Sequence, residues 1–379
     1  MTTTDNPKSR TPKYALFANQ VRQQIETGEL KTGDQLPSFA QMLARYGIGQ
    51  STVERMYSLL EQEGLVIREP NRGIFVAVPK RRGKTGAIGL LIGSDGFLSH
   101  PYYVRLLSAI QSAAHNEHTE IVLLHENSRI SPDKMDGLLL CQGQVDRMLQ
   151  RVPAGLPAIS LVHRSKMTPS VVADETDGIR AAVQHLLDLG HRRIAYLSCG
   201  VQSWMNTSAK QRMAAYQDTL KAAGIKPLNR WCRPVFRPFD TTQSFEETGY
   251  ARTKQWLDED WRQLGFTALL AHNDDVAIGA IDAFQAAGMR VPDDVSVVGF
   301  DGTEISEKYR PRLTTVELPL GEIGARGVEL LLARIAEEPA TDCPRQTDAP
   351  ETIVFPTRFH VRDSTATLPA RDLLTATSE

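Results

Sequence analysis

The feature that most constrains this fold is the alternation of short β-rich apolar runs with helical segments from Thr85 onward. Such alternation is typical of parallel sheets covered by helices on both faces. The predicted strands are Ala87 to Ile92, Glu120 to Leu124, Gly137 to Cys141, Ala158 to Val162, Ile194 to Ser198, Ala268 to His272, Val295 to Phe300 and Thr314 to Leu318. With this many strands, an α/β domain of two doubly wound lobes is more natural than one sheet.

Helical segments separate these strands. Their predicted ranges are Tyr102 to Glu117, Asp177 to Leu189, Ala209 to Ala223, Thr248 to Asp258, Val276 to Ala287 and Leu320 to Ala336. We expect this two-lobed domain to span residues 86–365 and to be followed by a tail over residues 366–379.

The stretch from Gly33 to Val76 has a different pattern. Ser38 can cap a helix whose apolar residues recur at helical spacing up to Tyr46, and Gly47 then breaks the chain. A second helix can start at Gln50, Ser51 or Thr52 and end at Gly64. Two short helices joined by a glycine-containing turn are the helix-turn-helix plan.

Two β-rich runs, Leu65 to Ile67 and Ile74 to Val76, flank a turn that contains Pro70, Asn71 and Gly73, and so predict a hairpin. The hairpin would be a wing. Each feature alone fits two packed helices and a hairpin with a solvated charged face. The capped helices, the turn and the glycine-tipped hairpin occur together in order, which favours a winged helix-turn-helix.

The boundaries of this N-terminal domain follow from composition. Residues 1–12 are polar and predict a disordered lead, and Tyr14 to Thr27 predicts an amphipathic helix that closes the domain at residues 13–78. Residues 79–85 are basic and interrupted by proline and glycine, which predicts a linker.

The domain resembles the GntR-type winged helix-turn-helix regulators. The resemblance rests on Leu36-Pro37-Ser38, the turn at Gly47, Ser51-Thr52-Val53, Glu63-Gly64-Leu65 and Asn71-Arg72-Gly73-Ile74-Phe75-Val76. It implies that the second helix enters the major groove of DNA with its N-terminal residues against base edges. The DNA-binding residues it implies are Gln50, Ser51 and Thr52 at the bases, Arg45, Arg55 and Arg72 at phosphates or grooves, and Asn71 and Gly73 in the wing.

Charge is distributed unevenly along the chain. Residues 1–84 hold 13 Lys or Arg and 8 Asp or Glu, a balance of +5, whereas the remaining 30 basic and 37 acidic residues give −7. A basic head on an acidic body fits nucleic-acid contact by the head alone, although an ordinary fluctuation of surface charge could produce the same balance.

Metal, disulfide and membrane sites have no support in the sequence. The four cysteines, Cys141, Cys199, Cys232 and Cys343, lie far apart and form no metal-ligand spacing, so we expect buried reduced thiols and no cofactor. The polar N-terminus is not followed by an apolar core, and no apolar run approaches the roughly 18 residues that span a bilayer. These observations predict a cytoplasmic protein.

Polar and aromatic residues follow several predicted strands at their carboxyl ends, where ligands of such folds bind. Amide, carboxylate and guanidinium groups beside aromatic faces suit a polyhydroxylated ligand. The residues in these positions are His100, Tyr102, Tyr103, His163, Arg164, Asn273, Asp301 and Glu317.

The same region is similar to the LacI-type effector domain and the related periplasmic sugar-binding proteins. The matching motifs are His100-Pro101-Tyr102-Tyr103, Val172-Ala173-Asp174 with Gly178, Leu189 to Ile194, Arg212 with Tyr216, Asn273-Asp274 with Gly279-Ala280, Val297 to Asp301, Leu313 to Val316 and Val361 to Ser364. The resemblance implies a cleft between two lobes that binds a small sugar.

The resemblance also implies roles for individual residues. Arg212, Asn273 and Asp301 would hydrogen-bond ligand hydroxyls, Tyr102 and Tyr103 would flank the ring, Arg164 would contribute from the crossover between lobes, and Trp204 would add a stacking face. His100, His163 and Glu317 complete the expected site. For these three and Trp204, a purely structural role is an equal alternative.

The whole chain resembles hybrid regulators in which a GntR-type head is joined to a LacI-type sensor, as in arabinose-responsive regulators. We therefore expect a homodimeric repressor that binds a roughly palindromic operator and is controlled by a sugar. A solute-binding protein without DNA regulation is the alternative that the sensor alone would permit. An enzyme is disfavoured because the chain has no Gly-x-Ser-x-Gly elbow, phosphate-binding glycine loop or His-Glu-x-x-His helix.

Overall fold

The structure is a computed structural model in which the described residues are 12–26, 29–31, 33–63, 65–69, 72–77, 85–92, 100–141, 143–198, 207–235, 244–337 and 350–368. The predicted lead, apart from Pro12, and the predicted linker, apart from Thr85, lie outside these residues. So does the predicted tail beyond Leu368. Among the single residues named above, Gly64, Pro70, Asn71, Cys199, Trp204 and Cys343 are also outside the described part.

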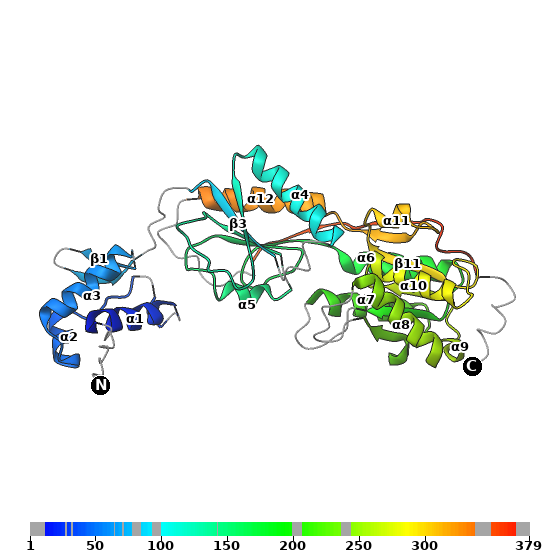
Figure 1. The fold of residues 1–379 in the computed structure, drawn as a ribbon, viewed down its shortest axis with the longest axis horizontal. Coiled ribbons are helices and arrows are strands. Elements are labelled where there is room, and N and C mark those ends of the chain that lie inside the picture. The colour runs from blue at the N-terminus through cyan, green and yellow to red at the C-terminus, as the bar shows by residue number, and fades with distance from the viewer. Residues whose placement is uncertain are drawn as a thin grey trace, which may run out of the picture. The chain divides into compact units, whose positions relative to one another are not determined.

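The N-terminal unit has three helices and a hairpin (Figure 1): α1 Lys13–Glu26, α2 Phe39–Tyr46, α3 Gln50–Gln62, β1 Val66–Glu69 and β2 Gly73–Val76. Ser38 accepts from the backbone of Gln41, whose side chain accepts in return from the backbone of Ser38, a complete capping box for α2. Gly47 ends this helix in the left-handed conformation. The predicted caps Ser38 and Gly47 and the helix-turn-helix order are confirmed, whereas the predicted helix end at Gly64 lies outside the described residues.

The second helix of this unit begins at Gln50, and its N-cap is Gly49, which offers no side chain. The hydroxyls of Ser51 and Thr52 are therefore not used as caps. The two strands pair antiparallel with Val66 opposite Val76, which confirms the predicted hairpin. Val53, Met56 and Leu60 on the inner face of α3 are fully buried in the core of this unit.

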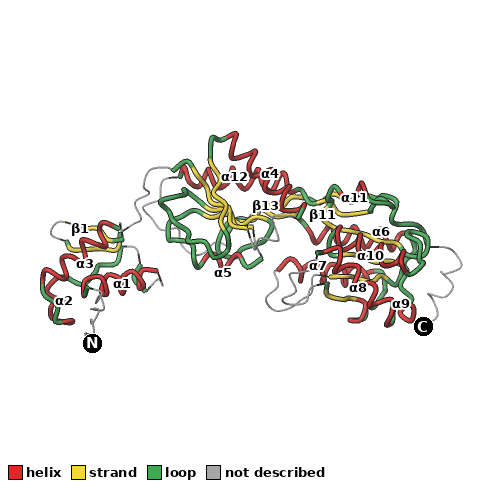
Figure 2. The backbone as a smooth tube through the Cα atoms, in the orientation of Figure 1, coloured by secondary structure: helices red, strands yellow, loops and turns green. Residues whose placement is uncertain are grey.

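The first lobe of the second unit contains a six-stranded sheet in the order β13-β7-β6-β5-β3-β4. Its strands are all parallel (yellow in Figure 2): β3 Ala87–Ile92, β4 Glu120–Leu124, β5 Leu138–Cys141, β6 Ala158–Leu161, β7 Ser170–Ala173 and β13 Thr352–Phe355. Helices α4 Pro101–Asn116 and α12 Leu320–Ala336 pack against each other beside β3 (Figure 1), and α5 Val145–Leu149 follows β5.

The second lobe repeats this plan with the strand order β14-β12-β11-β10-β8-β9. The strands are β8 Ile194–Ser198, β9 Cys232–Pro234, β10 Ala268–Ala271, β11 Ser296–Asp301, β12 Thr314–Glu317 and β14 Arg358–His360, of which only β14 runs antiparallel to its neighbour. The helices are α6 Glu175–Asp188, α7 Thr207–Ala222, α8 Phe245–Glu259, α10 Asp274–Ala286 and the short η2 Asn229–Trp231, α9 Trp261–Leu264 and α11 Ile305–Lys308.

The chain passes three times between the lobes. It leaves the first sheet after β7, returns between β12 and α12, and crosses again between β13 and β14. The predicted strands are each confirmed to within one residue and the predicted long helices to within three. The expectation that Arg164 lies on a crossover is wrong, because Arg164 lies in the loop between β6 and β7, and both of these strands belong to the first sheet.

Helices α8 and α10 cross with their backbones in close approach. A Cβ atom on Gly279 would lie 2.0 Å from the carbonyl oxygen of Glu246, and one on Gly249 would lie 2.4 Å from that of Val276. Only glycine at both positions allows the two helices this contact, since real Cβ atoms do not approach a carbonyl oxygen so closely.

His191 connects three parts of the second lobe. Its Nδ1 lies 2.9 Å from the Thr267 hydroxyl, and its Nε2 lies 3.0 Å from the Ser296 hydroxyl and 3.1 Å from the Ala366 carbonyl oxygen. Burial lowers the pKa of His191 to about 4, although the Ala366 carbonyl opposes the shift.

This buried imidazole predicts acid-sensitive stability. Between the unfolded pKa near 6.5 and the folded pKa near 4 the unfolded chain binds the extra proton, so stability falls as the pH drops. From pH 7.5 to 5.0 we expect His191 to contribute about 2 kcal/mol of lost unfolding free energy, measured by urea denaturation. The variant His191→Gln cannot titrate at this position, so it should lose about 2 kcal/mol less unfolding free energy over the same pH range. If unfolding free energy depended on pH equally in the two proteins, this assignment would be contradicted.

In the described residues no helix combines the length and apolarity needed to cross a bilayer.

Candidate functional site

Arg212 on α7 is the centre of the candidate site. Its Nε donates to Glu175 Oε2 at 2.8 Å, one Nη donates to the carbonyl oxygen of His272 at 3.1 Å, and its guanidinium carbon lies 3.8 Å from the centroid of the Phe300 ring. The residue is 7% exposed. Burial disfavours its charge, but Glu175 more than compensates and raises the pKa of Arg212 above its usual value.

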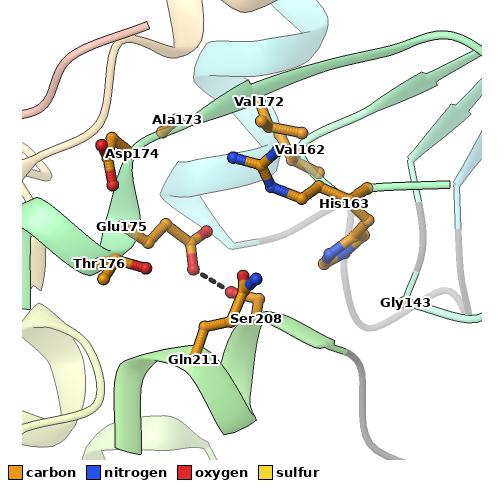
Figure 3. Close-up of a pocket in the computed structure, with 11 residues that line it drawn as sticks. Gly143, Val162, His163, Val172, Ala173, Asp174, Glu175, Thr176, Ser208 and Gln211 are labelled. Carbon is orange, nitrogen blue, oxygen red and sulfur yellow. Dashed lines mark hydrogen bonds between the residues drawn. The ribbon is translucent and has the colours of Figure 1, made fainter. Parts of the chain in front are cut away.

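Glu175, the first residue of α6, is the carboxylate partner of Arg212. It also accepts a hydrogen bond from the Ser208 hydroxyl, drawn as a dashed line in Figure 3. Burial opposes its ionisation, but Arg212 and the two hydrogen bonds keep the pKa of Glu175 below its usual value. Sequence reasoning missed Glu175, because an acidic residue in the first turn of a helix is expected from the helix dipole alone.

Asp301 lies at the carboxyl end of β11 with a φ of 99°, in the left-handed region. It is 6% exposed, and its burial raises its pKa well above the usual value although Arg212 opposes the shift. Val162, at the end of β6, also has a positive φ, 61°. Backbone strain at two strand ends is typical of functional sites, because the surrounding structure must maintain it.

His100 and Asn273 form a second part of the site. His100 caps α4 by accepting from the Tyr102 backbone, and its Nε2 lies 3.1 Å from the Asp275 carboxylate. Asn273 uses its side-chain oxygen to cap α10 and directs its amide nitrogen towards His100 at 3.5 Å. Both residues are thus held by local capping bonds while one polar atom of each faces the other lobe.

Aromatic rings accompany these polar groups. Tyr102 and Tyr103 meet edge to face at 4.9 Å, and the His100 ring lies 4.9 Å from that of Phe245. Burial raises the pKa of Tyr102 well above its usual value, and the charges of Tyr103, Glu175 and Asp301 raise it further. The structure therefore brings Tyr102 into the same electrostatic cluster as Arg212 and Asp301.

A small pocket lies beside this cluster (Figure 3). Its volume is about 40 Å³, and its lining is Gly143, Val162, His163, Arg164, Val172, Ala173, Asp174, Glu175, Thr176, Ser208 and Gln211. His163 is half-buried; desolvation lowers its pKa, Glu175 opposes the shift and Arg212 acts in the same direction as desolvation. The volume is far below the roughly 300–1,000 Å³ of typical ligand pockets, so a sugar requires the lining to move.

Glu317 has a different environment. Its carboxylate accepts from Arg105 of α4 at 3.0 Å and lies 2.6 Å from Nε2 of His360. Arg105 also donates to the Gly302 carbonyl at 2.8 Å. These partners tie Glu317 into a bridge between the lobes, while its predicted contact with a ligand stays a prediction.

The predicted DNA-binding residues lie on the N-terminal unit. Arg45, Gln50, Ser51 and Arg55 are exposed on or beside α2 and α3, and Thr52 is half-buried. The side chain of Arg72 is 72% exposed, and its guanidinium lies 5.6 Å from the Phe75 ring and 2.5 Å from the Glu69 carboxylate. Gly73 follows at the tip of the hairpin with a φ of 123°.

Arg68, which sequence reasoning did not single out, pairs with Glu61 at 2.9 Å and with Glu54 at 3.3 Å. These pairs neutralise two acidic residues on α3. In the part of the chain that the structure describes, no cluster of three or more His, Cys, Asp or Glu is arranged to hold a metal ion.

Comparison with known families and proteins agrees with this architecture. Residues 13–76 match the model of bacterial regulatory proteins of the gntR family, and residues 183–365 match that of a periplasmic binding protein-like domain. The HTH-type transcriptional regulator CelR of Thermobifida fusca is 27% identical over 357 residues, which cover 86% of this chain and 98% of CelR.

Solved structures give the same result. A lac repressor dimer bound to operator and the anti-inducer ONPF aligns with a TM-score of 0.61 and 26% identity, covering 75% of this chain and 96% of that one. The complex of CelR with cellobiose aligns with a TM-score of 0.61 and 23% identity, covering 87% of this chain and all of that one, which supports the fold.

Proposed function

We infer that this chain is a DNA-binding transcriptional regulator, because it joins a GntR-type winged helix-turn-helix head to a periplasmic-binding-protein-like domain. The proteins it resembles include CelR, an HTH-type transcriptional regulator, and a lac repressor dimer bound to operator. The chain is not an enzyme.

We propose that the regulating ligand is a small, uncharged sugar bound around Arg212. The observation that carries this proposal is the buried guanidinium stacked on Phe300 and already neutralised by Glu175. An anionic ligand would have to compete with Glu175, whereas sugar hydroxyls can share its lone pairs and the free Arg212 donors. The solved complex of CelR holds cellobiose, an uncharged sugar.

Within the site, we propose that Asn273 and Asp301 hydrogen-bond hydroxyls and that Tyr102 and Tyr103 flank the ring. His100, His163 and Arg164 would complete the wall once the lobes rearrange around the ligand. Trp204 would add a stacking face, and Glu317 would also contact the ligand.

We propose further that the protein acts in the cytoplasm as a homodimeric repressor. Two heads related by a two-fold axis fit a roughly palindromic operator. Sugar binding can weaken DNA binding only by as much as the sugar prefers one arrangement of the lobes over the other. His100 pairs with Asp275 and Arg105 pairs with Glu317 across the two lobes, and such a rearrangement would change both contacts.

The direct test is a thermal-shift screen of the full chain against neutral pentoses, hexoses and disaccharides, with uronic acids and sugar phosphates as charged counterparts. A ligand that binds only the folded state raises the melting temperature. We expect at least one neutral sugar to raise the melting temperature, and to raise it more than its phosphorylated form does. A shift produced only by charged sugars would overturn the uncharged class, and no shift from any sugar would overturn the sugar assignment.

On the head, we propose that Gln50, Ser51 and Thr52 contact bases, that Arg45, Arg55 and Arg72 contact phosphates, and that Asn71 and Gly73 belong to the wing.

Arg72→Ala should weaken DNA binding about tenfold, because one charge-assisted hydrogen bond is lost, and should have no effect on sugar binding. Fluorescence anisotropy with genomic operator fragments at several salt concentrations should also show a salt slope smaller by about one.

The control for this variant is Arg290→Ala, which removes another exposed arginine, one that is paired with Asp293 and Asp294 on the second lobe. It should leave both activities unchanged. Equal losses in the two variants would mean that Arg72 has no special contact with DNA.

A further inference from the structure

A second and larger pocket lies at the opposite edge of the second sheet from Arg212. It is formed where β8 and β10 begin, whereas Asn273 and Asp301 lie where β10 and β11 end. Its volume is about 480 Å³, within the roughly 300–1,000 Å³ of small-molecule sites. We call it the arginine pocket, because Arg192, Arg193 and Arg262 line it.

Three positive charges line the arginine pocket and no acidic residue does. This contrasts with the chain as a whole, whose net charge is −2. Arg192 and Arg262 are exposed, and neither makes an ion pair or side-chain hydrogen bond with any residue that the structure describes. Arg193 is half-buried and is held by the Leu264 carbonyl oxygen at 3.2 Å, which leaves its remaining donors available.

The floor of the arginine pocket is apolar. Trp261 and Phe266, with ring centroids 5.0 Å apart, and Leu368 contribute to the lining and are each less than 10% exposed. Trp261 and Phe266 belong to the packed core, where their rings are tilted by 53° to each other. Apolar side chains beside three arginines can recognise an apolar body and an attached anion together.

We propose that the arginine pocket binds a small organic anion, with its phosphate or carboxylate group on the arginines and its apolar portion against Trp261, Phe266 and Leu368. Arginine suits this task because its planar fork donates two parallel hydrogen bonds to such an anion. The ligand differs in charge from the proposed sugar and binds at the other end of the lobe, so the regulator would have a second chemical input.

The test is isothermal titration of the full chain at low salt with phenyl phosphate, inorganic phosphate and benzyl alcohol. Phenyl phosphate, which carries both features, should bind at least tenfold more tightly than inorganic phosphate, and neutral benzyl alcohol should not bind. The affinity for phenyl phosphate should fall as salt is added. Equal binding of benzyl alcohol would overturn the proposal.

The variants locate the binding. The double variant Arg192→Ser with Arg262→Ser should lower the affinity for phenyl phosphate at least tenfold. The control Arg180→Ser removes an exposed arginine of α6 outside the arginine pocket and should change this affinity less than twofold. Unchanged binding in the double variant, or an equal loss in Arg180→Ser, would overturn the assignment. Both substituted arginines of the pocket are exposed, so the fold is expected to persist, and a thermal melt of each variant checks this.

Discussion

Arg212→Ala is expected to abolish the response to sugar, with at least a hundredfold loss of sugar affinity, while the full-length variant keeps its affinity for DNA. The substitution removes the proposed hydrogen bonds to the ligand and the cationic face over Phe300. Hydrogen bonds to a charged group contribute about 1.5–3 kcal/mol each, so the loss of two reaches this size. Sugar titration by calorimetry and operator binding by anisotropy measure the two activities separately.

One complication of this variant is structural. Removing Arg212 leaves Glu175 buried without its partner, and breaking a buried pair in this way costs about 3–5 kcal/mol of stability. The double variant Arg212→Ala with Glu175→Gln removes the unpaired charge and should recover most of the lost melting temperature. It should still not respond to sugar. A double variant that regains the response would show that Arg212 only supports the fold.

Gly279→Ala should have the largest effect on stability of any single methyl group added to this lobe. The new Cβ would lie 2.0 Å from the Glu246 carbonyl oxygen, and backbone cannot rotate away as a side chain would. Helices α8 and α10 would have to separate, and we expect a loss of about 3 kcal/mol or more in unfolding free energy.

The matched control is Gly321→Ala in α12, where an added Cβ meets nothing within 4 Å. There the usual preference of helices for alanine should apply, with a gain of about 0.5–1 kcal/mol. Urea denaturation of both variants compares the same chemical change in two environments. Similar effects at the two positions would contradict the close contact between α8 and α10.

The sequence predicts the elements of this protein well because each has a local signal. Ser38 with Gln41 and the turn at Gly47 define α2 by capping, and buried apolar runs define strands such as Ala87–Ile92. The missed strands, Ser170–Ala173, Cys232–Pro234, Thr352–Phe355 and Arg358–His360, are only three or four residues long. Their identity as strands depends on pairing with distant partners, which no local pattern records.

In the candidate site, too, residues placed by local signals were predicted and residues defined by distant partners were not. The prediction that Arg212, Asn273 and Asp301 would come together depends on the ends of strands and helices that local patterns place correctly. Glu175 was missed because its partner is 37 residues away and its own position has an ordinary explanation. The placement of Arg164 was wrong for a related reason, since the unnoticed strand β7 moved the first crossover from Arg164 to Asp174.

The three crossings between the lobes also set an order of events during synthesis. The second sheet is almost complete once β12 has emerged, but the first still lacks α12 and its edge strand β13, which are encoded after Glu317. On the ribosome the second lobe can therefore assemble while the first waits with one face of its sheet uncovered. A nascent chain halted before residue 320 would expose that apolar face to chaperones, because the helix that covers it is encoded after most of the second lobe.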